Sequence, residues 1–228
     1  MATTDTFRFT QSMVGKKAIM AVSGTVMFGW IFVHMIGNLQ IYAGPQKIND
    51  YGKFLHDTPA LLWGSRIVLL FAVLAHVFSA LSLYGTARSA RTEGYRKSNT
   101  RAATVASKSM RYGGIVLVAF IVYHLAQLTW GVKATLPQFV FGDVYCNVVH
   151  AFKIWWITAI YLVAQVFLFL HLYHGVWSVF QTLGVNSPRW DERFQLGAKG
   201  FAALVLVGNC SIPVAVLAGI VPSAGICS

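Results

Sequence analysis

The sequence predicts an all-α membrane protein with five transmembrane helices, and composition gives the first reason. Of its 228 residues, 56% are hydrophobic and only 11% are charged, whereas a soluble domain carries about 25% charged residues. The hydrophobic residues fall into five runs, each close to the roughly 20 residues that a membrane-spanning helix needs. The connecting segments are too short for a soluble domain. We therefore expect a single transmembrane domain over residues 1–228.

Each expected span is bounded by polar or turn-forming residues. The first follows Lys17 and ends before the 42–46 turn, and the second ends at the basic 88–111 loop. The third follows that loop, and the fourth lies between Lys153 and the 184–188 turn. The fifth contains no histidine and no charge, which predicts a peripheral supporting helix. The five spans are residues 18–41, 61–87, 112–130, 154–180 and 201–221.

The basic residues predict the orientation, because Lys and Arg concentrate in cytoplasmic loops. Thirteen of the 18 lie in the N-terminal tail and in the loops after spans 2 and 4, against five on the other side. This predicts a multi-pass protein of the bacterial cytoplasmic membrane, with a cytoplasmic N-terminus and an external C-terminus. The topology accounts for the net charge of +11 without nucleic-acid binding. No cleavable signal peptide is expected.

Five histidines lie inside the spans: His34, His76, His124, His171 and His174. Ionisable side chains at membrane depth are costly and indicate function. The alternatives are a hydrogen bond to a neighbouring helix, or a proton or ion relay in a transporter. Such transporters usually add carboxylates, and the five expected spans contain none.

Depth divides four of these histidines into two levels. Counted at about 1.5 Å per residue from the charged ends of the spans, His34 and His124 lie in the outer half. His171 lies in the inner half, and His76 lies nearer the middle, on the inner side. Four helices thus present two stacked pairs of imidazoles, as two bis-imidazole sites require.

Haem is the metal group that suits these pairs. Two neutral imidazoles hold haem iron without an anionic ligand, and small residues beside each histidine would leave room for a porphyrin edge, although they serve helix packing equally well. No CxxCH motif is present, so the haems would be non-covalent b haems. The cysteines are isolated in sequence and we expect them to be incidental: Cys146, Cys210 and Cys227.

The chain resembles the single-subunit, five-helix dihaem cytochrome b anchor of bacterial succinate:quinone oxidoreductases, which include succinate dehydrogenases and fumarate reductases. The matching segments are residues 23–25, 34–39 and 48–51 and the run His-Leu-Tyr-His-Gly-Val-Trp-Ser at 171–178. The resemblance implies a bundle of helices 1–4 around two stacked haems. It implies one haem on His34 and His124 (distal, outer) and one on His76 and His171 (proximal, inner).

The resemblance also implies a role in the respiratory chain and the tricarboxylic acid cycle. A flavoprotein subunit and an iron–sulfur subunit would dock on the cytoplasmic face. The basic 88–111 loop would either contribute to this docking or only reflect the usual excess of positive charge on the cytoplasmic side. This chain would pass electrons through both haems to a quinone, with menaquinone the expected species. It would have no dehydrogenase activity alone. The alternatives are quinol oxidation by a fumarate reductase, and the dihaem subunit of another respiratory enzyme.

Further residues have open roles. Candidate partners of the haem propionates, each of which otherwise reaches the lipid headgroups, are Lys16, Lys17, Lys108 and Arg111, with Arg66 on the outer side. His174 could bond a propionate, line a quinone pocket, relay protons or act structurally. His56 and His150 lie on the outer side, where both could simply be solvated. His150 could alternatively reach a quinone head group.

Overall fold

The computed structural model describes residues 10–90, 105–185, 187–223 and 225–227, and these contain helices and no strand. Five helices in this part of the chain are long and apolar enough to cross a membrane. They are α2 (Met13–Leu39), α4 (Pro59–Ser89), α5 (Val105–Leu128), α7 (Trp155–Thr182) and α8 (Asp191–Leu217). The prediction of an all-helical membrane protein with five spanning helices is confirmed.

Four of the five helices begin before the predicted spans, most clearly at α8, which starts ten residues early at Asp191. Hydrophobicity marks the part of a helix that lies in hydrocarbon, but backbone hydrogen bonds continue the helix into the headgroup region. Asp191 and Glu192 lie in the first turn of α8, where carboxylates interact favourably with the helix dipole. Boundaries predicted from hydrophobicity therefore left out the polar first turns of these helices.

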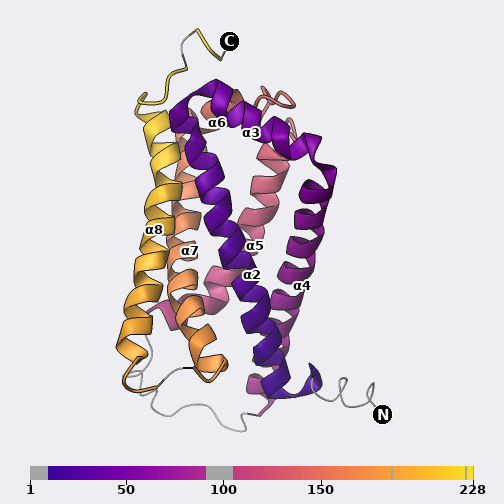
Figure 1. The fold of residues 1–228 in the computed structure, drawn as a ribbon, viewed down its shortest axis with the longest axis vertical. Coiled ribbons are helices and arrows are strands. Elements are labelled where there is room, and N and C mark those ends of the chain that lie inside the picture. The colour runs from indigo at the N-terminus through magenta and orange to yellow at the C-terminus, as the bar shows by residue number, and fades with distance from the viewer. Residues whose placement is uncertain (1–9, 91–104, 186, 224, 228) are drawn as a thin grey trace.

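The long helices pack in a definite order. α4 packs against α2, α2 against α7, and α7 against α5, while α8 lies against α7 and also touches α2. α2 and α5 make little or no direct contact in the described chain, and neither do α4 and α7. Figure 1 shows α8 at one edge of the bundle and α4 at the other. In the order α4, α2, α7, α5, each helix thus packs against the next one, and helices two places apart make little or no contact.

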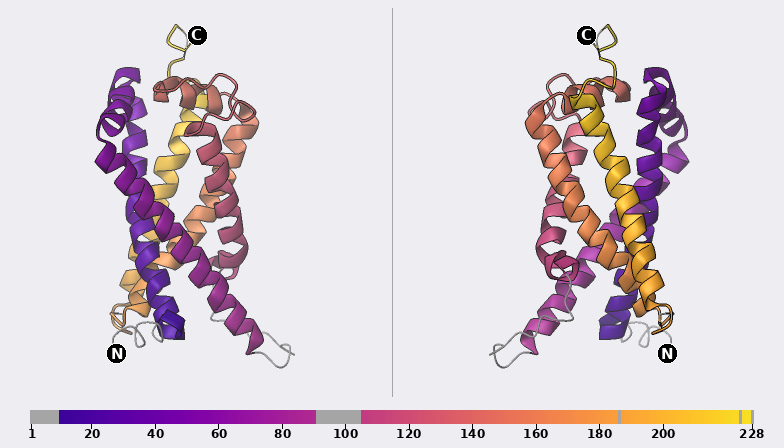
Figure 2. Two further views of the ribbon diagram at one scale, coloured as in Figure 1. Left: turned by 90° about the vertical axis from the view of Figure 1, so that its right-hand side faces the viewer. Right: turned by 90° about the vertical axis from the view of Figure 1, so that its left-hand side faces the viewer.

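Short helices cover one end of the bundle, where the sequence indicated only loops (Figures 1 and 2). We call this the cap end, and the opposite end, where α2 begins, the N-terminal end. Gly44, with φ +96°, turns the chain, and Pro45 begins α3, a position that suits its fixed φ. The Asp143 side chain caps α6 by accepting from the Cys146 amide. The cap consists of η1 (Gln40–Ala43), α3 (Pro45–Asp57), α6 (Val144–Phe152) and the 129–143 segment that joins α5 to α6.

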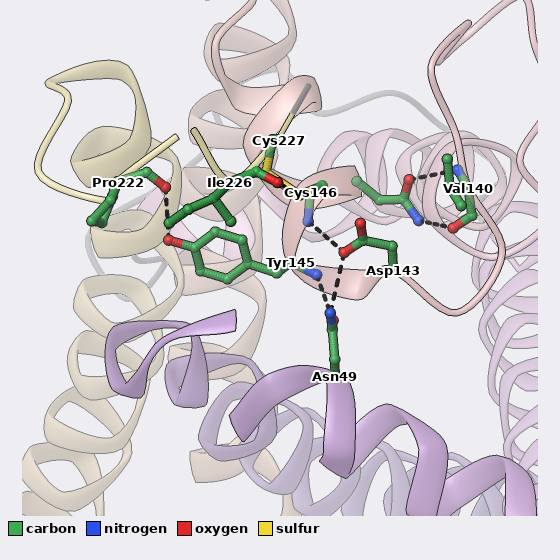
Figure 3. Close-up of a disulfide and its surroundings, with 9 residues drawn as sticks. Asn49, Val140, Asp143, Tyr145, Cys146, Pro222, Ile226 and Cys227 are labelled. Carbon is green, nitrogen blue, oxygen red and sulfur yellow. Dashed lines mark hydrogen bonds between the residues drawn. A yellow bond between two sulfur atoms is a disulfide. The ribbon is translucent and has the colours of Figure 1, made fainter. Parts of the chain in front are cut away.

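The expectation that all three cysteines are incidental is wrong. Cys146 on α6 forms a disulfide with Cys227 in the C-terminal tail (Figure 3), and only Cys210 is free in the described chain. The two partners are 81 residues apart in sequence, so their spacing carried no signal. They meet because α8 returns the chain to the cap end.

Polar side chains hold the cap together around this disulfide (Figure 3). The Asn49 amide donates to Asp143 at 3.2 Å, and its oxygen accepts from the Tyr145 amide at 2.9 Å. The Tyr145 hydroxyl donates to the Pro222 carbonyl at 2.8 Å, and burial raises the pKa of this hydroxyl. Hydrogen bonds thus join α3 to α6 and α6 to the C-terminal tail, and the disulfide is a second link between α6 and the tail.

Candidate functional site

Four of the predicted histidines face one another in two pairs. Towards the cap end, the rings of His34 (α2) and His124 (α5) have centres 5.9 Å apart and planes at 90°. Towards the N-terminal end, the rings of His76 (α4) and His171 (α7) have centres 6.0 Å apart and planes at 58°. We call these the cap-end pair and the N-terminal pair. The structure brings together the same partners that the resemblance implied.

Each pair joins two helices that do not pack on each other, α2 with α5 and α4 with α7. The separation between the rings suits a shared metal ion. A metal–imidazole bond is about 2.0 Å long, so two imidazoles on opposite sides of one ion place their ring centres about 6 Å apart. Both pairs match this distance.

The surroundings of the rings are open in part. His34 is exposed and the other three histidines are half-buried. A side-chain carbon added at Gly29, near His34, or at Gly175, one turn after His171, would meet no atom within 4 Å. At these two glycines the described chain therefore leaves open space.

Other glycines near the histidines serve helix packing. A side-chain carbon at Gly37 would lie 2.8 Å from the Tyr51 ring, and one at Gly113 would lie 3.3 Å from Phe167. Gly24 lets the His76 ring come close to α2, because an added carbon there would lie 3.3 Å from it. Some of the small residues near the histidines therefore allow close helix packing, as Gly37 and Gly113 do, whereas others, such as Gly29 and Gly175, adjoin open space.

Hydrogen bonds hold one ring of each pair at Nδ1. His76 Nδ1 lies 3.1 Å from the Met20 carbonyl and 3.4 Å from Ser23 Oγ. His124 Nδ1 lies 3.2 Å from the Tyr161 hydroxyl. In contrast, His171 Nδ1 is buried and has no hydrogen-bond partner among the described residues. When Nδ1 of a histidine is hydrogen-bonded in this way, Nε2 is available as a metal ligand.

A buried polar cluster extends from His124 to the cap. The Tyr161 hydroxyl donates to Gln127 Oε1 at 2.8 Å. Gln127 Nε2 donates to the Tyr123 hydroxyl at 3.1 Å and to the Thr135 carbonyl at 3.2 Å. The sequence analysis missed these residues, although an uncharged amide such as Gln127 inside an apolar span was an available signal.

The remaining candidates lie at the two ends. His174, one turn after His171, has a buried Nδ1 with no hydrogen-bond partner in the described part of the chain, and its ring centre lies 6.0 Å from that of Trp177. The Arg111 guanidinium at the N-terminal end donates to the hydroxyls of Tyr84 and Tyr112, so it joins α4 to α5. At the same end Lys16 is half-buried, and Lys17 and Lys108 are exposed.

Three candidates at the cap end contact an aromatic ring or line a pocket. Arg66 is half-buried, with its guanidinium 5.1 Å from the centre of the Trp63 ring. His56 is exposed and lies edge-on to Phe141. His150 lines a pocket of about 380 Å³ with Lys153, and within the residues that the structure describes its buried Nδ1 has no hydrogen-bond partner.

Part of the predicted basic face lies outside the described residues. These positions are Arg8 in the N-terminal tail and four members of the 88–111 loop, Arg91, Arg96, Lys97 and Arg101. Within the described residues, no group of three or more His, Cys, Asp or Glu side chains could hold a metal ion.

Comparison of the chain with protein-family models, with curated proteins and with solved structures finds no match.

Proposed function

We propose that this chain is the dihaem cytochrome b membrane anchor of a succinate:quinone oxidoreductase. The observation that carries the proposal is the arrangement of the two imidazole pairs. Their ring centres lie 5.9 and 6.0 Å apart, and each pair joins helices that make little or no other direct contact in the described chain. If these histidines only formed hydrogen bonds between packed helices, we would expect the helices of each pair to contact each other closely. Instead, the two rings of each pair come from helices that make little or no other direct contact.

In this proposal His34 and His124 hold one b haem, and His76 and His171 hold the other. Bound haem supplies one-electron transfer between ferric and ferrous iron. The histidines bind as neutral imidazoles, so no buried anion is needed. The long helices that carry these histidines are largely apolar, so lipid rather than water would surround the site in a membrane. Because the pairs lie at two levels of the bundle, the chain holds two redox groups one above the other.

The cap end would face the outside of the bacterial cytoplasmic membrane. Disulfides persist in oxidising compartments, and the Cys146–Cys227 disulfide lies at the cap end. The basic residues of the N-terminal end favour the cytoplasmic side for that end. Two independent arguments, redox chemistry and charge, thus support the same orientation, with the N-terminus inside and the C-terminus outside.

The proposed partners follow from the resemblance and from the charged face. A flavoprotein and an iron–sulfur subunit would dock at the N-terminal end, where the described chain places eight basic residues. The chain would accept their electrons and exchange them with a quinone, with menaquinone the expected species. The described basic residues at this end are Lys16, Lys17, Arg88, Lys108, Arg111, Arg189, Arg193 and Lys199.

The test is to purify the tagged chain with its native partners and to compare reduction by succinate with reduction by dithionite. We expect succinate to reduce b-haem absorbance in a complex that contains flavin. Haem that dithionite reduces and succinate does not, in a complex without flavin, would assign the chain to another respiratory enzyme. A colourless complex would contradict the electron-transfer function and favour a relay role for the histidines.

A further inference from the structure

Three hydrogen bonds connect His124 on α5 to a backbone carbonyl in the cap. Gln127 Nε2 donates to the Thr135 carbonyl, Tyr161 donates to Gln127 Oε1, and the Tyr161 oxygen lies 3.2 Å from His124 Nδ1. Gln127 is fully buried and Tyr161 is 6% exposed. Buried polar groups of this kind are costly unless each one is paired, so the directions of these bonds are strongly constrained.

The direction of every bond follows from the Thr135 carbonyl. A carbonyl oxygen only accepts hydrogen bonds, so the NH₂ group of Gln127 must face it and Oε1 must face Tyr161. The hydroxyl of Tyr161 then uses its one hydrogen on Oε1. Its oxygen can therefore only accept a hydrogen bond from His124.

The protonation of His124 is fixed as a result. Nδ1 must carry the hydrogen, and because a neutral imidazole carries only one, Nε2 has none. The opposite orientation of the Gln127 amide would place two acceptors against each other at Thr135, which leaves buried groups unpaired. The Tyr161–Gln127 bond alone would be enough to join α5 to α7. The bonds to Thr135 and His124 additionally determine which nitrogen of His124 carries the hydrogen.

We propose that Tyr161, oriented by Gln127, is a positioning residue that fixes the tautomer and ring orientation of His124 and so tunes the haem at the cap-end pair. This inference rests on the proposed function, because it assigns a role towards the haem that His34 and His124 would hold. A hydrogen bond at Nδ1 also makes an imidazole a stronger donor to its metal. Stronger donation stabilises ferric over ferrous iron and lowers the reduction potential.

The experiment compares Tyr161→Phe with Tyr123→Phe in the purified complex. Tyr161→Phe removes the hydroxyl that accepts from His124. Tyr123→Phe removes a hydroxyl from the same cluster but leaves the Thr135–Gln127–Tyr161–His124 sequence of bonds intact. The readouts are haem content, the midpoint potential of each haem and the electron paramagnetic resonance signal of each ferric haem. The cap-end haem is identified as the one lost in His34→Ala.

In Tyr161→Phe we expect the potential of the cap-end haem to rise and its resonance signal to shift, since His124 loses both donor strength and a fixed ring plane. The other haem and the Tyr123→Phe variant should be unchanged. Selective loss of the cap-end haem in Tyr161→Phe alone would also support the proposal. If that variant does not assemble, Gln127→Leu replaces it and should raise the same potential.

An unchanged potential and signal for the cap-end haem in Tyr161→Phe would overturn this inference and leave the dihaem function intact. The same result in Gln127→Leu would do so if Tyr161→Phe does not assemble. Equal shifts in both haems would overturn it too, because they would indicate a general structural change. Absence of haem from the unmodified complex would instead refute the proposed function.

Discussion

The cap-end pair and the N-terminal pair have similar ring separations, 5.9 and 6.0 Å, but different surroundings. His124 is joined through Tyr161 and Gln127 to a cap that a disulfide closes. In the N-terminal pair, His76 Nδ1 is hydrogen-bonded to the Met20 carbonyl of its packing neighbour α2, and His171 Nδ1 has no hydrogen-bond partner among the described residues. One pair is therefore supported by a network of side chains and the other chiefly by backbone.

This difference predicts that the two sites respond differently to the same kind of change. Side-chain networks can be altered by one substitution, whereas a backbone carbonyl stays in place as long as its helix does. The cap-end site should therefore be sensitive to changes in the cap, and the N-terminal site should be largely insensitive to them.

The largest expected effect is the loss of one haem when one histidine of a pair is replaced. His34→Ala should lose only the cap-end haem and His76→Ala only the other, because each removes one of two axial ligands. Haem per chain, with absorbance spectra, measures this. His56→Ala, an exposed histidine on α3, is the control and should keep both. Loss of the same haem in both variants would disprove the pairing.

A smaller effect is expected from removing the disulfide. Loss of a disulfide typically costs about 2–4 kcal/mol of stability, and Cys227→Ser should lower the thermal midpoint followed by haem absorbance. The cap-end haem should be released first, because its support reaches into the cap. The matched control is Cys210→Ser, which replaces the free cysteine. Equal release of both haems would contradict the contrast between the two ends.

The sequence predicted the histidine pairs because their information is local. Continuous hydrophobic runs locate the spans, and distance from charged residues gives depth, so His34 and His124 fall at one level. The supports of the pairs were not predictable in this way. Tyr161 reaches Gln127 across 34 positions of the chain, Asn49 reaches Tyr145 across 96, and Cys146 reaches Cys227 across 81. Such contacts depend on how the helices are placed.

Asn49→Ala sharpens the comparison within the cap. It removes two hydrogen bonds between α3 and α6, each contributing about 0.5–1.5 kcal/mol, and it leaves the Tyr145 amide without that acceptor. We expect destabilisation of about 1–3 kcal/mol on this basis, measured by thermal unfolding. Gln46→Ala breaks only an exposed bond to Asp50 on the same helix and should have little effect. Similar losses in the two variants would argue against a structured cap.

The smallest effect is expected from Ser23→Ala at the N-terminal pair. His76 Nδ1 keeps its 3.1 Å contact with the Met20 carbonyl when the more distant serine oxygen is removed. The potential of the N-terminal haem should change by less than about 1 kcal/mol in equivalent free energy, the size of one ordinary hydrogen bond. Thr25→Ala, which removes a similar bond to the α2 backbone, is the control. A shift as large as that of Tyr161→Phe would show that both pairs depend equally on side chains.

The central claim is that the two imidazole pairs hold two haems. The most direct test is the haem content per chain of the purified, unmodified complex, determined from the absorbance of the extracted pyridine haemochrome. The account predicts two b haems for each copy of this chain. A complex of intact chains that contains one haem or none would contradict it.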